Sequence, residues 1–291
     1  MTYYLGVDAG GSHTRARLTD ETGALLGEGE GGPANARVGL ETLHVTLLDV
    51  CRQATAGLSD AEIATVKAGM GIAGINRMGM KAKIQALPFP FASLALSSDS
   101  MIANLGAHMG EDGAILILGT GSVGLVKRGE DSFSIGGYGF PISDEGSGAA
   151  LGLSAIRHAL RALDGRSRPS PLSQAVTEPF GHAIPRVIAW MDQATPKDYA
   201  NFAPLVMDYA ENGDDIALPI VREAALHVER FIETIFARGA SRCVLMGGLS
   251  PRMKPWLRAR TVAKLSEAMG DAIDGALILA GRPIAVEVGA V

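Results

Sequence analysis

The sequence predicts an α/β protein with two lobes. Its 291 residues exceed the common length of one domain and suffice for two. Short apolar runs that end at glycine alternate with longer segments of helical periodicity, which is the pattern of sheets flanked by helices. An apolar run, a glycine turn and a second run occur at residues 3–19 and again at residues 114–127. This recurrence indicates an internal structural repeat.

Composition excludes several classes of protein. Hydrophobic residues make up 47% of the chain and charged residues 20%, which is too apolar for intrinsic disorder. No apolar run approaches the roughly 18 residues that a membrane helix needs. The chain has 26 Lys and Arg against 31 Asp and Glu, for a net charge of −5, so it offers no basic surface for a nucleic acid. We expect neither a membrane nor a nucleic acid as partner.

The cysteines and the start of the chain predict a cytoplasmic location. Cys51 and Cys243 lie far apart and form neither a CxxC pair nor a disulfide framework, so two buried thiols in a reducing compartment are expected. Residues 1–11 lack the basic start and apolar core of a signal peptide and have the composition of a strand. The sequence leaves the oligomeric state open, a homodimer included.

The first lobe is predicted to begin with three antiparallel strands separated by glycine turns, the first within residues 1–11 and starting at about residue 3, the others at 13–20 and 23–29. The later elements are, in order, a helix at residues 40–54, a strand at 66–73, a helix at 77–86 and a strand at 93–96. These elements predict a sheet with crossover helices, and we place the end of this lobe at residue 106.

The second lobe, residues 107–291, is predicted to open with the strands of the repeat at 114–118 and 123–127. Helical periodicity then predicts helices at 147–164 and 214–238, with a Pro-rich stretch at 166–204 between them. A short apolar strand at 242–246 ends at two glycines, and a final helix is expected at 271–280.

The first glycine turn, DAGGSHT at residues 8–14, has the chemistry of a phosphate site. Its glycines permit positive φ and let backbone N–H groups approach an anion, while Ser12 and Thr14 add hydroxyl donors. Asp8 cannot face a phosphate favourably, but it can hold the waters of a Mg²⁺ that bridges two phosphates. A plain hairpin turn capped by Asp8 is the alternative, at equal weight for this turn alone.

The second glycine turn, GTGS at residues 119–122, favours the phosphate site over the plain hairpin turn, because two such turns in two lobes can hold one nucleotide. Neither turn matches a Walker A loop or the strand, GxGxxG, helix context of a dinucleotide fold, which disfavours a nicotinamide enzyme. Gly247-Gly248 is a third position for close backbone approach, with an ordinary strand-end turn as its alternative.

Five motifs in order, DAGGSHT, SSDS, GTGS, GGYGFPISDEGSG and LMGGL, resemble the superfamily of sugar kinases, actin and the heat-shock chaperone ATPases. Within it the chain is most similar to the BadF/BadG-type ATPase family, specifically to its bacterial glucosamine kinases and N-acetylglucosamine kinases. The resemblance covers nearly the whole chain. It implies duplicated ribonuclease-H-like (actin-like ATPase) sheets flanked by helices, a ligand cleft between the lobes, and ATP and Mg²⁺ as cofactors.

The resemblance also implies roles for individual residues. The phosphate-binding positions are Gly10, Gly11, Ser12, Thr14, Gly119, Thr120, Gly121 and Ser122. Gly247 and Gly248 lie on the adenosine side, and Asp8 binds Mg²⁺, through water. The family's catalytic acid lies at the end of a strand, and Asp99 matches that position. The sugar-contacting positions are Asn35, Asp99, Gly137, Tyr138 and Asp144.

Ordinary structural roles are open for several of these residues. Asp99 follows a strand, where a carboxylate can accept the proton of a sugar hydroxyl, but it could equally N-cap a helix at residues 100–108. Asp144 or its neighbour Glu145 could cap the helix that follows, and Asn35 has the composition of a turn residue.

The chain departs from the family pattern at a few positions. Ala9 stands where many relatives carry glycine, and His13 is an unusual neighbour for a phosphate. Tyr138 replaces the tryptophan of the animal N-acetylglucosamine kinases. The His- and Cys-rich zinc motif of the other bacterial sugar-kinase family is absent from the sequence, so we expect no structural zinc.

The sequence therefore predicts an ATP-dependent amino-sugar kinase that phosphorylates the 6-hydroxyl of glucosamine, with an N-acetylglucosamine kinase as the alternative. Two rivals rank lower. A dehydratase-activating ATPase needs several cysteines for an iron–sulfur cluster, and this chain has two. A non-enzymatic sugar-sensing regulator needs a DNA-binding domain, whereas the first strand starts at about residue 3 and the net charge is negative.

Overall fold

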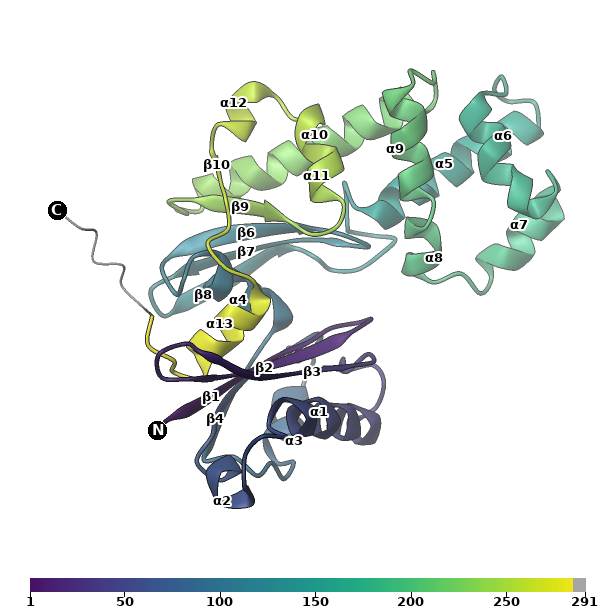
Figure 1. The fold of residues 1–291 in the computed structure, drawn as a ribbon. Coiled ribbons are helices and arrows are strands. Elements are labelled where there is room, and N and C mark those ends of the chain that lie inside the picture. Colours follow the sequence, from purple (N-terminus) through teal and green to yellow (C-terminus); the bar gives the residue numbers. More distant parts are fainter. Residues whose placement is uncertain (285–291) are drawn as a thin grey trace. The chain divides into compact units, whose positions relative to one another are not determined.

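The computed structural model describes residues 1–284, which form two compact units (Figure 1). Among the described residues, the first lobe comprises Met1–Asp112 together with residues 267–284, and the second comprises Gly113–Ser266. The predicted α/β fold with a repeated sheet is confirmed. The predicted end of the first lobe, residue 106, lies inside a helix, and the division follows Asp112.

The first lobe contains a five-stranded sheet of order β3-β2-β1-β4-β5. Its strands are β1 (Tyr3–Ala9), β2 (Thr14–Asp20), β3 (Leu25–Gly31), β4 (Lys67–Ile72) and β5 (Ser93–Ser97). The first three strands pair antiparallel, as the glycine turns predicted, while β4 runs parallel to β1 and to β5. The carboxyl ends of β1, β4 and β5 therefore share one edge of the sheet.

Helices cover both faces of this sheet. They are α1 (Leu40–Ala54), α2 (Asp60–Ile63), α3 (Met80–Gln85), α4 (Asp99–Ala107) and α13 (Ala272–Leu279). Leu5 and Val7 of β1 share a core with Leu43 and Leu47 of α1. Tyr4, the neighbour of Leu5 on the strand, instead joins a small core with α13, because successive strand residues face opposite ways. Asp8 is four residues from Tyr4 on the same strand, so it lies on the same face of the sheet as Tyr4, the face that packs against α13.

The C-terminal helix belongs to the first lobe, which corrects the predicted assignment of residues 271–280 to the second lobe. Glycines let its backbone approach the sheet and α4: a Cβ on Gly6 would lie 2.9 Å from the Ile273 carbonyl oxygen, and a Cβ on Gly106 would lie 1.7 Å from that of Asp271. Helical periodicity identifies such a helix but not the sheet against which it packs.

The second lobe repeats the sheet. Its strands are β6 (Gly113–Leu118), β7 (Ser122–Arg128), β8 (Asp131–Gly136), β9 (Cys243–Met246) and β10 (Leu265–Ser266). The order is β10-β9-β6-β7-β8, with β6 antiparallel to β7 and parallel to β9. Strand for strand, this is the topology of the first lobe, so the predicted internal repeat holds for the whole sheet.

The second lobe carries more helices than the first (Figure 1). They are α5 (Gly148–Leu163), α6 (Pro171–Thr177), η1 (Glu178–Phe180), α7 (Ile184–Met191), α8 (Pro196–Ala200), α9 (Ala203–Glu211), α10 (Ala217–Ala237), α11 (Ser250–Met253), η2 (Lys254–Trp256) and α12 (Ala259–Val262). The Pro-rich stretch thus contains helices, because its prolines occupy first turns, where the missing N–H costs nothing.

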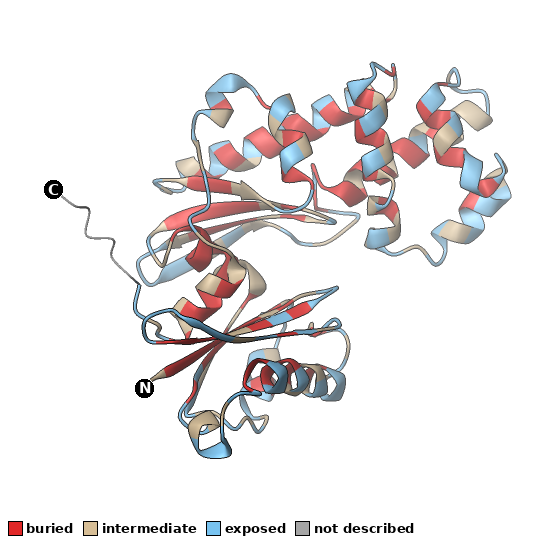
Figure 2. Ribbon diagram, in the orientation of Figure 1, coloured by how far each residue is buried: buried red, intermediate tan, exposed pale blue. Residues whose placement is uncertain are grey.

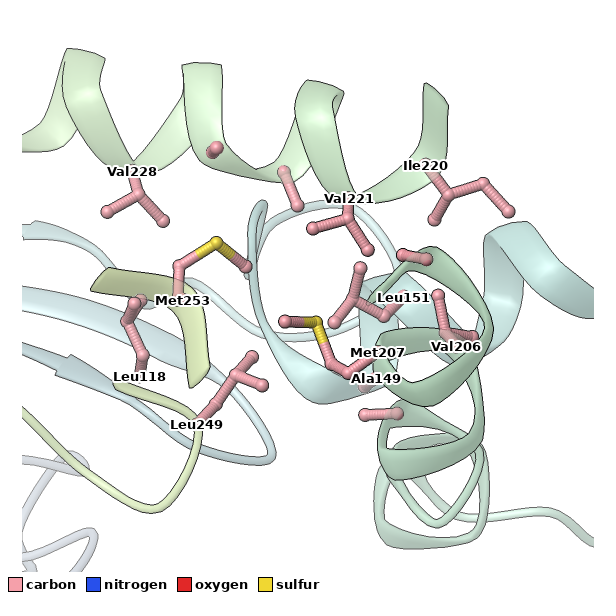
Figure 3. Packing of buried hydrophobic residues seen from close by; sticks show 14 of the residues in the cluster. Leu118, Ala149, Leu151, Val206, Met207, Ile220, Val221, Val228, Leu249 and Met253 are labelled. Atoms are coloured by element: carbon pink, nitrogen blue, oxygen red, sulfur yellow. The ribbon is translucent and has the colours of Figure 1, made fainter. Parts of the chain in front are cut away.

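Each lobe has its own hydrophobic core, visible as the buried strands and inward helix faces in Figure 2. In the second lobe, Val228 of α10 faces Met253 of α11 and Leu118 at the end of β6, and Val221 faces Leu151 of α5 and Met207 of α9 (Figure 3). Among residues 1–284, no helix is long and apolar enough to cross a membrane.

Candidate active site

The first glycine turn joins β1 to β2 at the carboxyl edge of the first sheet. The Gly10 N–H donates to the His13 carbonyl (3.0 Å), and the Ala34 N–H donates to the Gly10 carbonyl (3.3 Å). Within residues 1–284 the N–H groups of Gly11 and Ser12 have no hydrogen-bond partner, and both residues are exposed. This turn therefore presents two backbone donors and the Ser12 hydroxyl to an anion.

The two hydroxyl residues of this turn differ in their surroundings. Thr14 is fully buried, and its Oγ1 donates to the Gly32 carbonyl (2.7 Å). A phosphate contact by the Thr14 hydroxyl, which the family resemblance implies, requires this hydrogen bond to break. Ser12 carries the accessible hydroxyl.

Asp8 lies beside the turn, on the face of the sheet covered by α4 and α13. Its Oδ2 accepts a hydrogen bond from Arg15 Nη2 (3.1 Å), the residue directly opposite on β2. The carboxylate is 22% exposed. Asp8 is thus an ion-paired but accessible carboxylate at the end of a strand.

Asp99 is the first residue of α4 and follows β5. The N-cap of α4 is Ser98, whose Oγ accepts from the Met101 N–H (3.1 Å), so the alternative in which Asp99 caps this helix is wrong. Burial raises the pKa of the Asp99 carboxyl, and the negative charge of Asp8 raises it further, while the Ser100 N–H (2.8 Å) opposes both. A carboxylate of raised pKa is a stronger base.

Asn35 lies in a loop at the same edge of the first sheet. Its neighbour Ala36 donates to the Ala73 carbonyl at the end of β4 (2.9 Å), and the Ala73 N–H donates to Ala9 (2.9 Å). The Asn35 Oδ1 accepts from the Arg37 N–H (2.8 Å), so this side chain holds the turn that its composition allowed. The two N–H donors of Asn35 Nδ2 take no part in the hydrogen bond with Arg37.

The second glycine turn joins β6 to β7 and is bound to the start of α5. The N–H groups of Gly148 and Ala149 donate to the carbonyls of Gly119 (2.8 Å) and Thr120 (3.1 Å). The N–H groups of Thr120 and Gly121 have no partner in the described part of the chain. The helix thus holds the carbonyls of the turn inward and leaves two amides available to an anion.

Asp144 packs beneath this second turn. A Cβ on Gly121 would lie 3.1 Å from the Asp144 carboxylate, whose Oδ1 accepts from the Ser122 N–H at 3.4 Å. Asp144 is buried and has a left-handed backbone, with φ of 69°. Burial raises the pKa of its carboxyl, as does the charge of Glu145. The N-cap of α5 is Ser147, so neither acid caps that helix.

Gly137 and Tyr138 precede Asp144 in the same loop. Gly137 has a φ of 72°, which favours glycine, and Tyr138 is 79% exposed. The Tyr138 ring is therefore available to a ligand and makes no part of the core.

A cavity of about 310 Å³ opens beside the second turn, wholly within the second lobe. Its lining residues come from the turn, α5, α8, α9 and the segment after β9: Gly119, Thr120, Gly148, Lys197, Ala200, Asn201, Ala203, Pro204, Met207, Gly248, Leu249 and Arg252. Met207 and Leu249 also belong to the core of this lobe (Figure 3). Three residues that were predicted to bind ATP, Gly119, Thr120 and Gly248, therefore line the same cavity.

Gly247 directly precedes Gly248, which lines this cavity. The φ of Gly247 is 96°, and a Cβ would lie 2.3 Å from the Leu118 carbonyl oxygen, so only glycine fits. Its neighbour Gly248 has open space around it and lines the cavity.

Hydrophobic periodicity and motifs did not identify the polar residues of this cavity. Lys197 and Asn201 come from the Pro-rich stretch, in which no helix was predicted. Arg252 forms ion pairs with Asp208 and Glu211 of α9, each at 2.8 Å, which fix its guanidinium at the rim. Regular helix starts at Pro196 and Pro204 were the available clue.

The carboxylates of the first lobe fit Mg²⁺. This ion is commonly held by one or two carboxylates, water and substrate phosphates, and does not need a protein cage. Asp8 and Asp99 supply two carboxylates that are close enough to influence one another electrostatically. Within residues 1–284 there is no group of three or more His, Cys, Asp or Glu side chains that could hold a metal alone.

Two glycine turns with free amides, each beside an acid at the edge of a repeated sheet, define a phosphate-binding protein of the class of two-lobed ATPases. The chain belongs to the BadF/BadG/BcrA/BcrD ATPase family, whose model matches residues 5–280. This confirms the family predicted from the five motifs.

Individual relatives are named sugar kinases. The chain is 38% identical to the glucosamine kinase GspK of Vibrio cholerae over 97% of both chains. It is 28% identical to an N-acetylmuramic acid/N-acetylglucosamine kinase of Clostridium acetobutylicum over 81% of both. The crystal structure of a putative N-acetylglucosamine kinase from Chromobacterium violaceum superposes with a TM-score of 0.88 at 33% identity, covering 96% of this chain and 98% of that one.

Proposed function

We propose that this protein transfers the γ-phosphoryl group of ATP to the 6-hydroxyl of glucosamine. The observation that carries the proposal is the 38% identity to a glucosamine kinase over 97% of both chains. N-acetylglucosamine is the second candidate substrate, and the likeness to the Chromobacterium violaceum structure favours it.

The cavity beside the second turn supports the nucleotide part of the proposal. A volume of about 310 Å³ fits the nucleoside of ATP, and Lys197 and Asn201 can donate to it. Thr120 lines the same cavity and offers its free N–H to a phosphate at the mouth. The first turn contributes the N–H groups of Gly11 and Ser12 to the phosphates.

Asp8 would hold Mg²⁺ through its water ligands, and the bound ion would offset the negative charge of the phosphates during transfer. The Arg15 partner of Asp8 leaves that carboxylate 22% exposed and so accessible.

Asp99 acts as general base. Its carboxylate accepts the proton of the 6-hydroxyl as the bond from that oxygen to phosphorus forms and the bond to the leaving ADP oxygen breaks. Ser98 caps α4, and the Ser100 N–H donates to Asp99 Oδ1 (2.8 Å), so Oδ2 is the oxygen that would face the sugar.

Asn35, Gly137, Tyr138 and Asp144 orient the sugar in this proposal. Tyr138 offers an exposed ring. Asp144 and Glu145 give this side of the site negative charge, which favours a protonated 2-amine over an acetamide. The protonated 2-amine is therefore the group on which we base the choice of glucosamine.

A coupled ADP-release assay with glucosamine, N-acetylglucosamine, glucose and mannosamine tests the proposal. We expect kcat/KM for glucosamine to exceed that for N-acetylglucosamine at least about tenfold, or about 1.4 kcal/mol. Comparable values would overturn the choice of sugar and leave the kinase standing. No ADP release with any of the four sugars would overturn the kinase.

The cysteines weigh against an iron–sulfur activator. Cys51 and Cys243 are buried in different lobes, and burial raises the pKa of each thiol to about 12. Thiols in this state are poor cluster ligands, since the thiolate is the form that binds. ATP and sugar phosphates are cytoplasmic metabolites, so we also propose a cytoplasmic location. A homodimer stays a prediction, which sedimentation of the purified chain tests.

A further inference from the structure

Arg15 connects the phosphate edge of the first sheet to the C-terminal helix. Its Nη2 lies 3.1 Å from Asp8 Oδ2, and its Nη1 lies 3.8 Å from Asp271 Oδ2. Asp271 is the N-cap of α13 and accepts from the Asp274 N–H (3.0 Å). One guanidinium is thereby oriented by two carboxylates on different elements.

Arg17 provides a built-in comparison. It lies two residues along β2 on the same face, bonds Glu28 of β3 at 3.1 Å and lies 3.8 Å from Asp274 of α13. The two arginines thus share strand, face and type of partner. They differ in that the partner of Arg15 is Asp8, beside the glycine turn, whereas the partners of Arg17 in the described part of the chain are Glu28 and Asp274, away from that turn.

We propose that Arg15 is a positioning residue, which holds the Asp8 carboxylate in the orientation that receives the magnesium-bound nucleotide. The inference rests on the proposed role of Asp8. The recorded contact engages Oδ2 and so fixes the rotation of the carboxylate, leaving Oδ1 outside the ion pair. The positive charge of Arg15 also offsets the negative charge of Asp8, which lies close enough to Asp99 to act on its carboxylate.

A positioning role predicts a defect that depends on magnesium. Calorimetry on the full chain should show that Arg15→Gln weakens ATP binding at least about fivefold in the presence of Mg²⁺ and leaves binding without Mg²⁺ unchanged. The Mg²⁺ concentration for half-maximal activity should rise by a similar factor. Arg15→Lys, which retains one donor, should recover part of the loss, and Arg17→Gln should match the wild type.

Double variants separate this proposal from the role of Asp8. If Arg15 acts through Asp8, Arg15→Gln should add no further loss to Asp8→Asn. Fully additive losses, or equal weakening with and without Mg²⁺, would show that Arg15 binds the phosphates itself and overturn the proposal. A large effect of Asp8→Asn with none of Arg15→Gln overturns Arg15 alone. Unchanged Mg²⁺ dependence in Asp8→Asn overturns the metal role of Asp8 and the inference built on it. Melting temperatures of all variants control for folding, since exposed ion pairs contribute little stability.

Discussion

The two glycine turns are copies that have diverged in what supports them. In both, the first residue of the second strand sends its hydroxyl to a loop carbonyl: Thr14 to Gly32 at 2.7 Å and Ser122 to Glu145 at 2.8 Å. The second turn is also fastened to the start of α5, whereas the first is held by its hairpin and one bond from Ala34.

The acids near the two turns differ as well. Beside the first turn, Asp8 lies near the end of β1 and is paired with an arginine, and Asp99 begins the helix that follows β5. Beneath the second turn, Asp144 is buried against Gly121 and has a cavity of nucleoside size nearby in the same lobe. Under the proposed function, the first copy would supply the metal and proton chemistry and the second would hold the nucleotide.

The largest expected effect is that of a substitution at Asp99, in the first lobe. Asp99→Asn should lower kcat by at least about 10² and leave the KM values for ATP and sugar nearly unchanged, because it removes a proton acceptor and keeps the shape of the side chain. Steady-state kinetics measures both. A variant that keeps more than about a tenth of the wild-type kcat would remove Asp99 from the chemistry.

Added methyl groups should distinguish the two turns. Gly121→Ala places a Cβ 3.1 Å from the Asp144 carboxylate, which is buried and cannot yield freely, whereas Gly11→Ala meets open space. We expect Gly121→Ala to raise the sugar KM about fivefold, equivalent to about 1 kcal/mol, and Gly11→Ala to leave it unchanged. Equal sugar KM values for the two variants would contradict the support assigned to Asp144.

The shared hydroxyl bonds should behave alike in stability. Thr14→Val and Ser122→Ala each remove one buried hydroxyl and leave a carbonyl without that donor, so each should cost about 1 kcal/mol of unfolding free energy. Denaturant titration measures the loss. If only one variant is destabilised, the equivalence of the two hairpins fails.

The smallest effect concerns pH. Burial raises the pKa of Asp99 in the folded protein, so its ionised form is disfavoured there relative to the unfolded chain. Asp99→Asn should therefore melt slightly above the wild type at pH 7. The difference should shrink as pH falls through the raised pKa of Asp99 towards the unfolded value of about 3.8 to 3.9, because the wild-type side chain then becomes neutral too. Parallel melting curves at all pH values would contradict this.

Local patterns predicted the repeated part of the molecule well. Strand, glycine turn and strand are close in sequence, so β1–β2 and β6–β7 follow from composition alone. The cap of α4 was missed because Ser98 and Asp99 are both good N-cap residues, and only the backbone shows which one stands first.

Long-range packing was harder to predict. Assigning α13 to a sheet depends on Gly6 and Gly69 of the first lobe, whose missing side chains make room for that helix. Lys197 and Arg252 meet at one cavity from distant segments, so no spacing in the sequence announces them. The sequence patterns identified helices and strands but not which segments, distant in sequence, contact one another.

The return of α13 to the first lobe has a consequence for synthesis on the ribosome. The second lobe is one continuous segment, Gly113–Ser266, and can fold as soon as it has emerged. The first lobe begins the chain but lacks α13, which covers one face of its sheet together with α4, until residues 272–279 are made. The half that is translated first is therefore completed last, and a nascent chain stopped before α13 exposes the glycine-lined face of β1 and β4 to chaperones or to other chains.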